Sequence, residues 1–136
     1  MSEPESKRDF NERLIRDGME AFNRGDLTAI ATIFDERLES RVAPGLANTG
    51  VWHGTHGFEQ MVMEWGEAFE SQRNTIVSFS HPDEHHVIVE VHQEAVGVGS
   101  GVPVEMTLFY LFEIRDGRAV RFHLYQDQKA ALSAVR

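Results

Sequence analysis

The spacing of hydrophobic residues changes near residue 70 of this chain of 136 residues. Before that point, hydrophobic residues recur three or four positions apart, which is the spacing of one face of a helix. After it, runs rich in Val, Phe, Tyr and Ile are typical of strands. Helices followed by strands predict an α+β domain, in which the helices pack on one face of a curved sheet.

Three helices are predicted in the first half. Gly25 is expected to end the first helix, and Asp26 is expected to cap the N-terminus of the second. The three helices are expected at about residues 10–24, at Leu27 to Phe34, and from Thr55 or His56 to about Phe69. Residues 1–8 are polar and are expected to form a flexible lead-in, so that residues 9–136 make up a single domain. A short terminal helix is expected within residues 127–136.

Short strands are predicted at Leu38 to Val42 and at Val51 and Trp52, and longer ones at residues 74–80, 87–98, 102–114 and 119–126. If Ser100-Gly101 and Asp116-Gly117 form two-residue hairpin turns, Phe109 lies opposite both His92 and Leu124. His92 then shares a pocket-facing side of the sheet with Phe109, Phe122 and Leu124. A slip of one residue in either hairpin would exchange the faces.

Composition narrows the possible functions. The chain has 13 basic and 22 acidic residues and a formal net charge of −9, so we expect no binding to nucleic acid or to membrane surfaces. Cysteine is absent, which excludes disulfides, thiolate nucleophiles and Cys-ligated metals. Neither a long apolar run nor a signal-like N-terminus is present, so a cytoplasmic location is expected.

Several local motifs resemble those of the SnoaL-like domains, within the nuclear transport factor two-like superfamily. The resemblance covers about residues 9–134 and rests on Ala21-Phe22-Asn23-Arg24-Gly25-Asp26-Leu27, Pro44-Gly45, Trp52-His53-Gly54, Gly99-Ser100-Gly101-Val102, Arg115-Asp116-Gly117-Arg118, Leu124-Tyr125-Gln126-Asp127 and Ala130 with Leu132. It implies a cone-like α+β fold, in which a strongly bent, mixed or antiparallel sheet wraps round three helices and an apolar pocket. It also implies a homodimer formed through the outer face of the sheet.

The same resemblance argues against ketosteroid isomerisation by the usual residues. Matched position by position, the family's general base falls at Ala43, its phenolic donor at Gly18 and its carboxylic acid at Phe109. None of these side chains can take up a proton or stabilise an enolate. The Asp–Arg–Asp set of the epoxide hydrolase branch is likewise not found on the face predicted to point inward.

His92 is the strongest catalytic candidate, with Glu94 or Glu90 as its partner, because an imidazole in a pocket can act as acid or base near neutral pH. The alternative is a structural histidine paired with a carboxylate. His81, His85 and His86 surround Pro82-Asp83-Glu84 and are interpreted as a solvated loop. We predict neither a metal nor a cofactor.

Two further sets of residues are predicted. The walls of the substrate pocket are expected to include Phe22, Trp52, His53, Met61, Trp65, Phe109, Phe122, Leu124 and Gln126. A dimer face is favoured for Tyr110, Phe112, Arg121, His123 and Tyr125, with a polar pocket lining as the alternative if the facing is inverted.

Two hypotheses of function stay open. In the first, the chain is a cofactor-free enzyme of the cyclase, isomerase, dehydratase or hydrolase type that acts on a small hydrophobic molecule. In the second, it is a non-catalytic module for hydrophobic ligands or for dimeric interaction. The motifs favour the fold and do not choose between the reactions.

Overall fold

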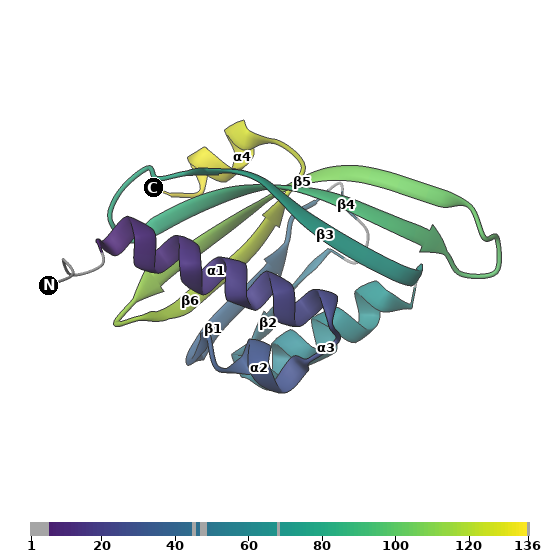
Figure 1. The fold of residues 1–136 in the computed structure, drawn as a ribbon, viewed down its shortest axis with the longest axis horizontal. Coiled ribbons are helices and arrows are strands. Elements are labelled where there is room, and N and C mark those ends of the chain that lie inside the picture. The colour runs from purple at the N-terminus through teal and green to yellow at the C-terminus, as the bar shows by residue number, and fades with distance from the viewer. Residues whose placement is uncertain (1–5, 45, 47–48, 68, 136) are drawn as a thin grey trace, which may run out of the picture.

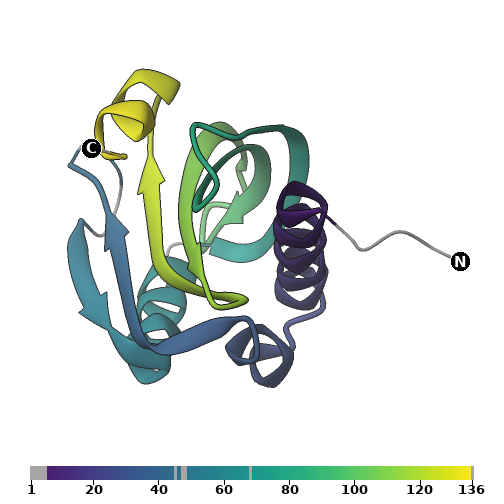
Figure 2. The same ribbon diagram turned by 90° about the vertical axis from the view of Figure 1, so that its left-hand side faces the viewer.

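The computed structural model describes residues 6–44, 46, 49–67 and 69–135. Six strands form one sheet in the order β2-β1-β6-β5-β4-β3, and it curls without closing (Figures 1 and 2). The strands are β1 (Phe34–Val42), β2 (Gly50–His53), β3 (Phe69–Ser80), β4 (His86–Gly97), β5 (Pro103–Arg115) and β6 (Arg118–Tyr125). Neighbouring strands are antiparallel except β1 and β6, which are parallel. The predicted α+β class is confirmed.

Three helices precede the long strands, as predicted. They are α1 (Lys7–Asn23), α2 (Leu27–Ala31) and α3 (Gly54–Gly66), and a fourth, α4 (Gln128–Ser133), follows β6. The side chain of Ser6 accepts a hydrogen bond from the backbone N–H of Asp9 and caps α1. The helix therefore begins at Lys7, inside the segment expected to be a lead-in, of which residues 1–5 lie outside the described residues.

Two helix ends differ from the prediction because strands compete for the same hydrophobic residues. Helix α2 ends at Ala31, and Phe34 already belongs to β1. Helix α3 ends at Gly66, and Phe69 begins β3. Both phenylalanines lie at helical spacing from the preceding hydrophobic residues, but their side chains pack against the core from the sheet instead.

The turn between β5 and β6 is the predicted Asp-Gly hairpin, with φ of 53° at Asp116 and 79° at Gly117. The turn between β4 and β5 is longer than predicted, since Val96 pairs with Pro103 and residues 98–102 lie between the two strands. His92 consequently lies opposite Thr107 rather than Phe109. This shift of two residues does not change which residues of β4 and β5 share a face.

A β-bulge between β5 and β6, in contrast, changes which residues of these two strands share a face of the sheet. Ala119 pairs with Ile114, whereas Arg121 pairs with Glu113, so Val120 is an extra residue on β6. Beyond the bulge, Phe112 lies opposite Phe122. The odd-numbered residues of β5 therefore share a face with the odd-numbered residues of β6, which is the opposite of the predicted pairing.

The facing predicted for β4 and β5 is accordingly wrong, while that of Phe122 and Leu124 on β6 agrees with the structure. The concave face of the sheet includes Val89 and Val91 on β4 and Tyr110 and Phe112 on β5, packed with the helices in the main core. The convex face has its own smaller core, built from Ile88, Leu111, Tyr125 and Ala43 around Ala131 of α4. Phe109 packs against this outer cluster.

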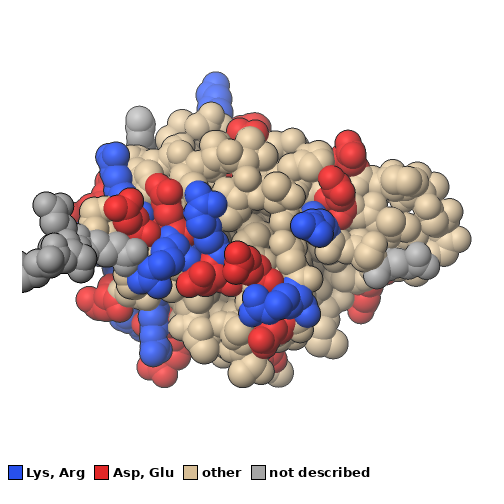
Figure 3. Space-filling view, in the orientation of Figure 1, with Lys and Arg blue, Asp and Glu red and all other residues tan. Residues whose placement is uncertain are grey.

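The surface of α1 is charged. Figure 3 shows acidic and basic side chains interspersed over this helix. On α1, Arg13 and Asp17 form an ion pair at 3.9 Å. Among the described residues, none of the helices is long and apolar enough to cross a membrane.

Candidate functional site

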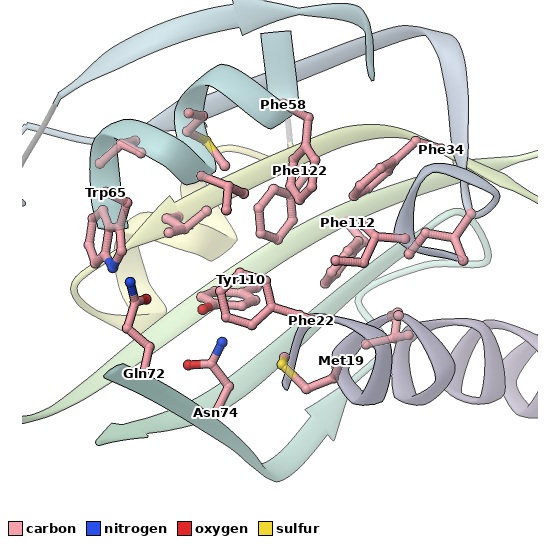
Figure 4. A pocket seen from close by; sticks show the side chains of 18 of the residues that line it. Met19, Phe22, Phe34, Phe58, Trp65, Gln72, Asn74, Tyr110, Phe112 and Phe122 are labelled. Carbon is pink, nitrogen blue, oxygen red and sulfur yellow. The ribbon is translucent and has the colours of Figure 1, made fainter. Parts of the chain in front are cut away.

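A cavity lies between the concave face of the sheet and helices α1, α2 and α3 (Figure 4). Most of its lining is hydrophobic: Ile15, Gly18, Met19, Phe22, Ile30, Ile33, Phe34, Val42, Phe58, Met61, Val62, Trp65, Phe112, Phe122 and Leu124. The centre of a water molecule can occupy about 70 Å³ of it. That is several times the ~10–15 Å³ that a single buried water needs by the same measure, which leaves room for a small organic molecule.

Aromatic rings form one wall of the cavity. Phe122 lies at the centre of this cluster, with its ring 5.7 Å from Phe58, 5.1 Å from Phe112 and 5.2 Å from Tyr110. The ring of Phe34 lies 4.6 Å from Phe58. Tilted and edge-on contacts of this kind fix the rings in place, so the wall is preformed.

Three amide side chains make one part of the wall polar. Gln93 on β4 and Asn74 on β3 are paired residues of neighbouring strands, and Nε2 of Gln93 donates to Oδ1 of Asn74 at 2.8 Å. The same nitrogen lies 3.4 Å from Oε1 of Gln72. Gln93 and Asn74 are only 2% and 4% exposed. Because alternate residues of a strand share a face, Gln72 and Asn74 both point into the cavity.

Asn23, the last residue of α1, holds this polar part in position. Its side chain accepts from the backbone N–H of Asn74 and donates to the backbone carbonyl of Asn74, both at 2.9 Å. Strand β3 is an edge strand, whose outer backbone groups have no neighbouring strand. The Asn23 amide takes the place of a neighbouring strand at this one residue.

Two buried polar atoms of the cavity lining have no hydrogen-bond partner among the described residues. They are Nε1 of Trp65 and Oε1 of Gln93. Buried polar atoms are nearly always paired, and leaving one unpaired costs about 1–3 kcal/mol. Figure 4 shows Trp65 of α3 and Gln72 of β3 pointing toward one another at this end of the cavity.

Tyr110 is the one ionisable residue among the described residues that line the cavity. Burial raises its pKa well above the ordinary value, so the phenol stays protonated at neutral pH. Figure 4 shows its hydroxyl on the side of the cavity where Asn74 lies. The described residues of the lining therefore offer hydrogen bonds but neither a carboxylate nor an imidazole.

The residues predicted for the pocket divide into two groups. Phe22, Met61, Trp65, Phe122 and Leu124 line the cavity. Their role in substrate binding stays a prediction.

The other four predicted pocket residues lie outside the cavity, and this part of the prediction is corrected. Trp52 covers Gly50 and Gly57, where an added Cβ would come within 2.9 and 3.1 Å of its side chain. His53 and Gln126 are exposed. Phe109 lies on the convex face because of the bulge.

The predicted catalytic residues also lie on the convex face, not in the cavity. Nε2 of His92 is 3.7 Å from Oε1 of Glu94, and the imidazole is about a third exposed. Glu90 shares their face as an alternate residue of β4. Ligand atoms of His92, Glu94 and Glu105 lie within 4.8 Å of one another and could contact a metal ion, but Glu94 and Glu105 are exposed.

The residues predicted for a dimer face are divided by the bulge. Tyr110 and Phe112 point into the cavity, which corrects their assignment to that face. Arg121, His123 and Tyr125 lie on the convex face, opposite Glu113, Leu111 and Phe109 of β5. A homodimer through this face stays a prediction.

His123 is the most buried ionisable residue of this outer group, with 5% of its surface exposed. Its Nε2 lies 2.9 Å from Oε2 of Glu39, and its Nδ1 lies 3.2 Å from the hydroxyl of Tyr125. Burial lowers the pKa of His123 and outweighs the opposing effect of Glu39. Burial also raises the pKa of Tyr125.

Histidines of the loop after β3 and of the first residue of β4 have carboxylate partners. His81 Nε2 lies 2.6 Å from Glu12 of α1, and His86 Nδ1 lies 2.8 Å from Asp83. Burial disfavours the charged form of Asp83, but hydrogen bonds from His86 and from two backbone N–H groups outweigh it and lower the pKa of Asp83. His86 is buried and begins β4, which corrects its assignment to a solvated loop.

Sequence reasoning missed the amide group of Gln72, Asn74 and Gln93. One signal was available, because Gln93 occupies the same alternate positions of β4 as Val89, Val91 and Ala95. An amide within an otherwise apolar alternate series indicates a polar group in the core, and buried amides need partners.

A family model described as the SnoaL-like domain matches residues 15–122. No curated protein matches the sequence.

Solved structures share the fold at low sequence identity. TerC, crystallised with polyporic acid, superposes with a TM-score of 0.79 at 18% identity, covering 91% of this chain and 96% of TerC. A putative polyketide cyclase from Xanthomonas campestris gives 0.69 at 20% identity, covering 96% of this chain and all of the other. A Catenulispora acidiphila protein of ketosteroid isomerase-like fold, in complex with trimethylamine, gives 0.73 at 15% identity, covering 88% and 89%. With the family model matching most of its length, the chain belongs to the family of SnoaL-like domains.

Proposed function

We propose that this protein binds a small, uncharged and largely apolar molecule in the cavity, and that the cavity side chains do not perform acid–base catalysis. The observation that carries the proposal is the lining, whose described residues combine fifteen hydrophobic or glycine residues with three amides and one protonated phenol. An ionised ligand would lose its hydration and find no opposite charge among the described lining residues.

Acid–base catalysis needs a proton donor or acceptor within hydrogen-bond reach of the reacting atom. The enzyme hypothesis assigned this role to His92 in the pocket, and His92 lies on the other face of the sheet. Tyr110 stays protonated and can donate a hydrogen bond to a bound molecule. These features favour the binding hypothesis over the enzyme hypothesis.

Two proteins of similar fold were crystallised with small molecules. TerC was crystallised with polyporic acid, and the Catenulispora acidiphila protein with trimethylamine. Both are small organic molecules. At 18% and 15% identity these matches concern the fold alone, so the ligand of the present chain has to be inferred from its own lining.

The two tryptophans of the chain provide a direct test by NMR. Trp65 lines the cavity and Trp52 does not, so their indole N–H signals serve as reporter and internal control. Titration with p-xylene, an uncharged single-ring molecule, should shift the Trp65 signal in a saturable manner and leave the Trp52 signal in place. Trp52→Phe assigns the two signals.

A pair of neighbouring variants completes the test. Val62 is half-buried in the cavity lining, and Val62→Phe should weaken p-xylene binding by filling part of the space. Met63 is its neighbour on α3 but is 67% exposed, so Met63→Phe should bind p-xylene like the wild type. A wild-type protein whose Trp65 signal does not respond to p-xylene, or responds equally in both variants, would refute the proposal.

A further inference from the structure

We infer that the molecule bound in this cavity carries a hydroxyl group that hydrogen-bonds to the side-chain amide of Gln93. The inference rests on the proposed function and concerns the polar group of the ligand rather than its apolar body. It starts from the unpartnered carbonyl oxygen of a side chain that is 98% buried, since Gln93 is 2% exposed.

The amide nitrogen of Gln93 is already bound within the protein. It donates to Asn74 at 2.8 Å and lies 3.4 Å from the acceptor oxygen of Gln72. A primary amide has two N–H donors, so both have acceptors here. The carbonyl oxygen has none among the described residues, which leaves one end of the amide available to a ligand.

The unpaired end of Gln93 exists whichever way the amides are turned. Reversing Gln72, Asn74 and Gln93 together would let the oxygen of Gln93 accept from the other two amides. The nitrogen of Gln93 would then be the end without a partner. In either arrangement one polar end of Gln93 faces the cavity unpaired.

A hydroxyl group fits both arrangements because it donates one hydrogen bond and accepts others. It can donate to the Gln93 oxygen, or accept from the Gln93 nitrogen if the amides are reversed. The indole N–H of Trp65, a second unpartnered donor of the cavity lining, can also donate to a hydroxyl oxygen. An ether or ketone oxygen cannot donate, and a hydrocarbon offers nothing to either atom.

A carboxylate is disfavoured by the same lining. The described cavity residues include neither lysine nor arginine, so an ionised ligand would be desolvated without a counter-charge. Asn23 supports the hydroxyl site indirectly, since its two hydrogen bonds to the Asn74 backbone fix the residue to which Gln93 is bound. Asn23 is therefore a positioning residue.

The test compares p-xylene and p-cresol, which are nearly equal in size, with the slightly larger p-toluate. p-Cresol replaces one methyl of p-xylene by a hydroxyl, and p-toluate carries a carboxylate. The measured quantity is the ratio of the Kd of p-cresol to that of p-xylene, from the Trp65 indole shift. Gln93→Met, which keeps the length of the side chain without its polar end, should raise this ratio about tenfold or more, because the hydroxyl would be buried without its partner.

Gln126→Met is the matched control, because Gln126 is exposed and outside the cavity. It should leave the ratio at the wild-type value. A second measurement needs only the wild-type protein: the side-chain NH₂ signals of Gln93 should shift with p-cresol more than with p-xylene. p-Toluate should not bind at concentrations that saturate the site with p-cresol.

The outcomes separate the two proposals. If p-xylene does not shift the Trp65 signal of the wild-type protein, the proposed binding function itself is refuted. If p-xylene binds but the ratio is the same in wild type and Gln93→Met, or the Gln93 signals respond equally to both probes, only the hydroxyl inference is overturned. Binding of p-toluate as tight as that of p-cresol would also overturn it.

Discussion

Ser40 offers a test of how much an unpaired polar atom costs in this fold. It lies on β1, opposite Trp52 of β2 and Phe122 of β6, and it is fully buried. Its hydroxyl oxygen has no hydrogen-bond partner among the described residues. We expect Ser40→Ala to increase the free energy of unfolding, although most substitutions of buried residues lower it.

The magnitude follows from two opposing effects. A buried hydroxyl without a partner costs about 1–3 kcal/mol, and alanine removes that cost. The substitution also removes the dispersion attraction of one oxygen for its neighbours, at ~0.1–0.2 kcal/mol for each pair of atoms. Because a buried oxygen touches several atoms, this second effect offsets part of the gain and leaves a net stabilisation of about 1 kcal/mol.

Urea denaturation measures this difference directly. The midpoint should rise by roughly 0.5 M with an unchanged m-value, given m of about 1–3 kcal/mol/M for small proteins. Ser78→Ala is the matched control, because Ser78 is exposed on β3 and its removal should change stability by less than about 0.5 kcal/mol. A lower midpoint for Ser40→Ala would show that the hydroxyl has a favourable partner and would refute the reasoning.

Three further predictions concern Asn23, which holds Asn74 in position, the buried His123, and Gly117 of the last hairpin. Asn23→Ala should lower the free energy of unfolding by about 1–2 kcal/mol, measured by urea denaturation, since it removes two hydrogen bonds to Asn74 from a partly solvated position. The free energy of unfolding of the wild type should fall as the pH drops from 7.5 to 5.5. Burial lowers the pKa of His123 in the folded protein, so the unfolded chain binds more protons at this residue. His123→Gln should reduce this dependence of stability on pH. Gly117→Ala should cost about 1–2 kcal/mol of stability, because φ is 79° at that residue.

Each of these three has its own control and contrary outcome. Asn23→Ala at wild-type stability would mean that water replaces both bonds without loss. His53→Gln removes an exposed histidine and should keep the wild-type pH slope; an equal slope in His123→Gln would contradict the role given to burial. Gly66→Ala, at the end of α3 where φ is not positive, should be neutral or stabilising, and a cost equal to that of Gly117→Ala would exclude backbone strain as the cause.

Much of the fold could be predicted from local sequence. Hydrophobic spacing identified three early helices and the later strands, and Asp116-Gly117 identified the final hairpin. These features depend on interactions between residues close together in the chain, namely caps, turn geometry and periodicity. The ends of α2 and α3 were less predictable, since Phe34 and Phe69 could continue a helix or begin a strand.

The candidate site was predicted less well because it depends on which way each strand faces. Phe22, Met61 and Trp65 come from helices, where the hydrophobic stripe itself marks the inner face, and they line the cavity. His92 comes from a strand whose two faces both carry apolar residues, so its pattern did not distinguish inside from outside. Both cores of the protein use β4, with Val91 in one and Ile88 in the other.

The sequence by itself therefore determined the order and type of the elements, the family and the last hairpin turn. The tertiary structure decided which faces of β4 and β5 line the cavity, and a single extra residue of β6, Val120, was responsible. Side chains of a strand alternate with a period of two, so one inserted residue exchanges the two faces of everything paired beyond it. The bulge brings Tyr110 and Gln93 inside and leaves His92 outside, a result set by pairing between strands rather than by the residues of either strand alone.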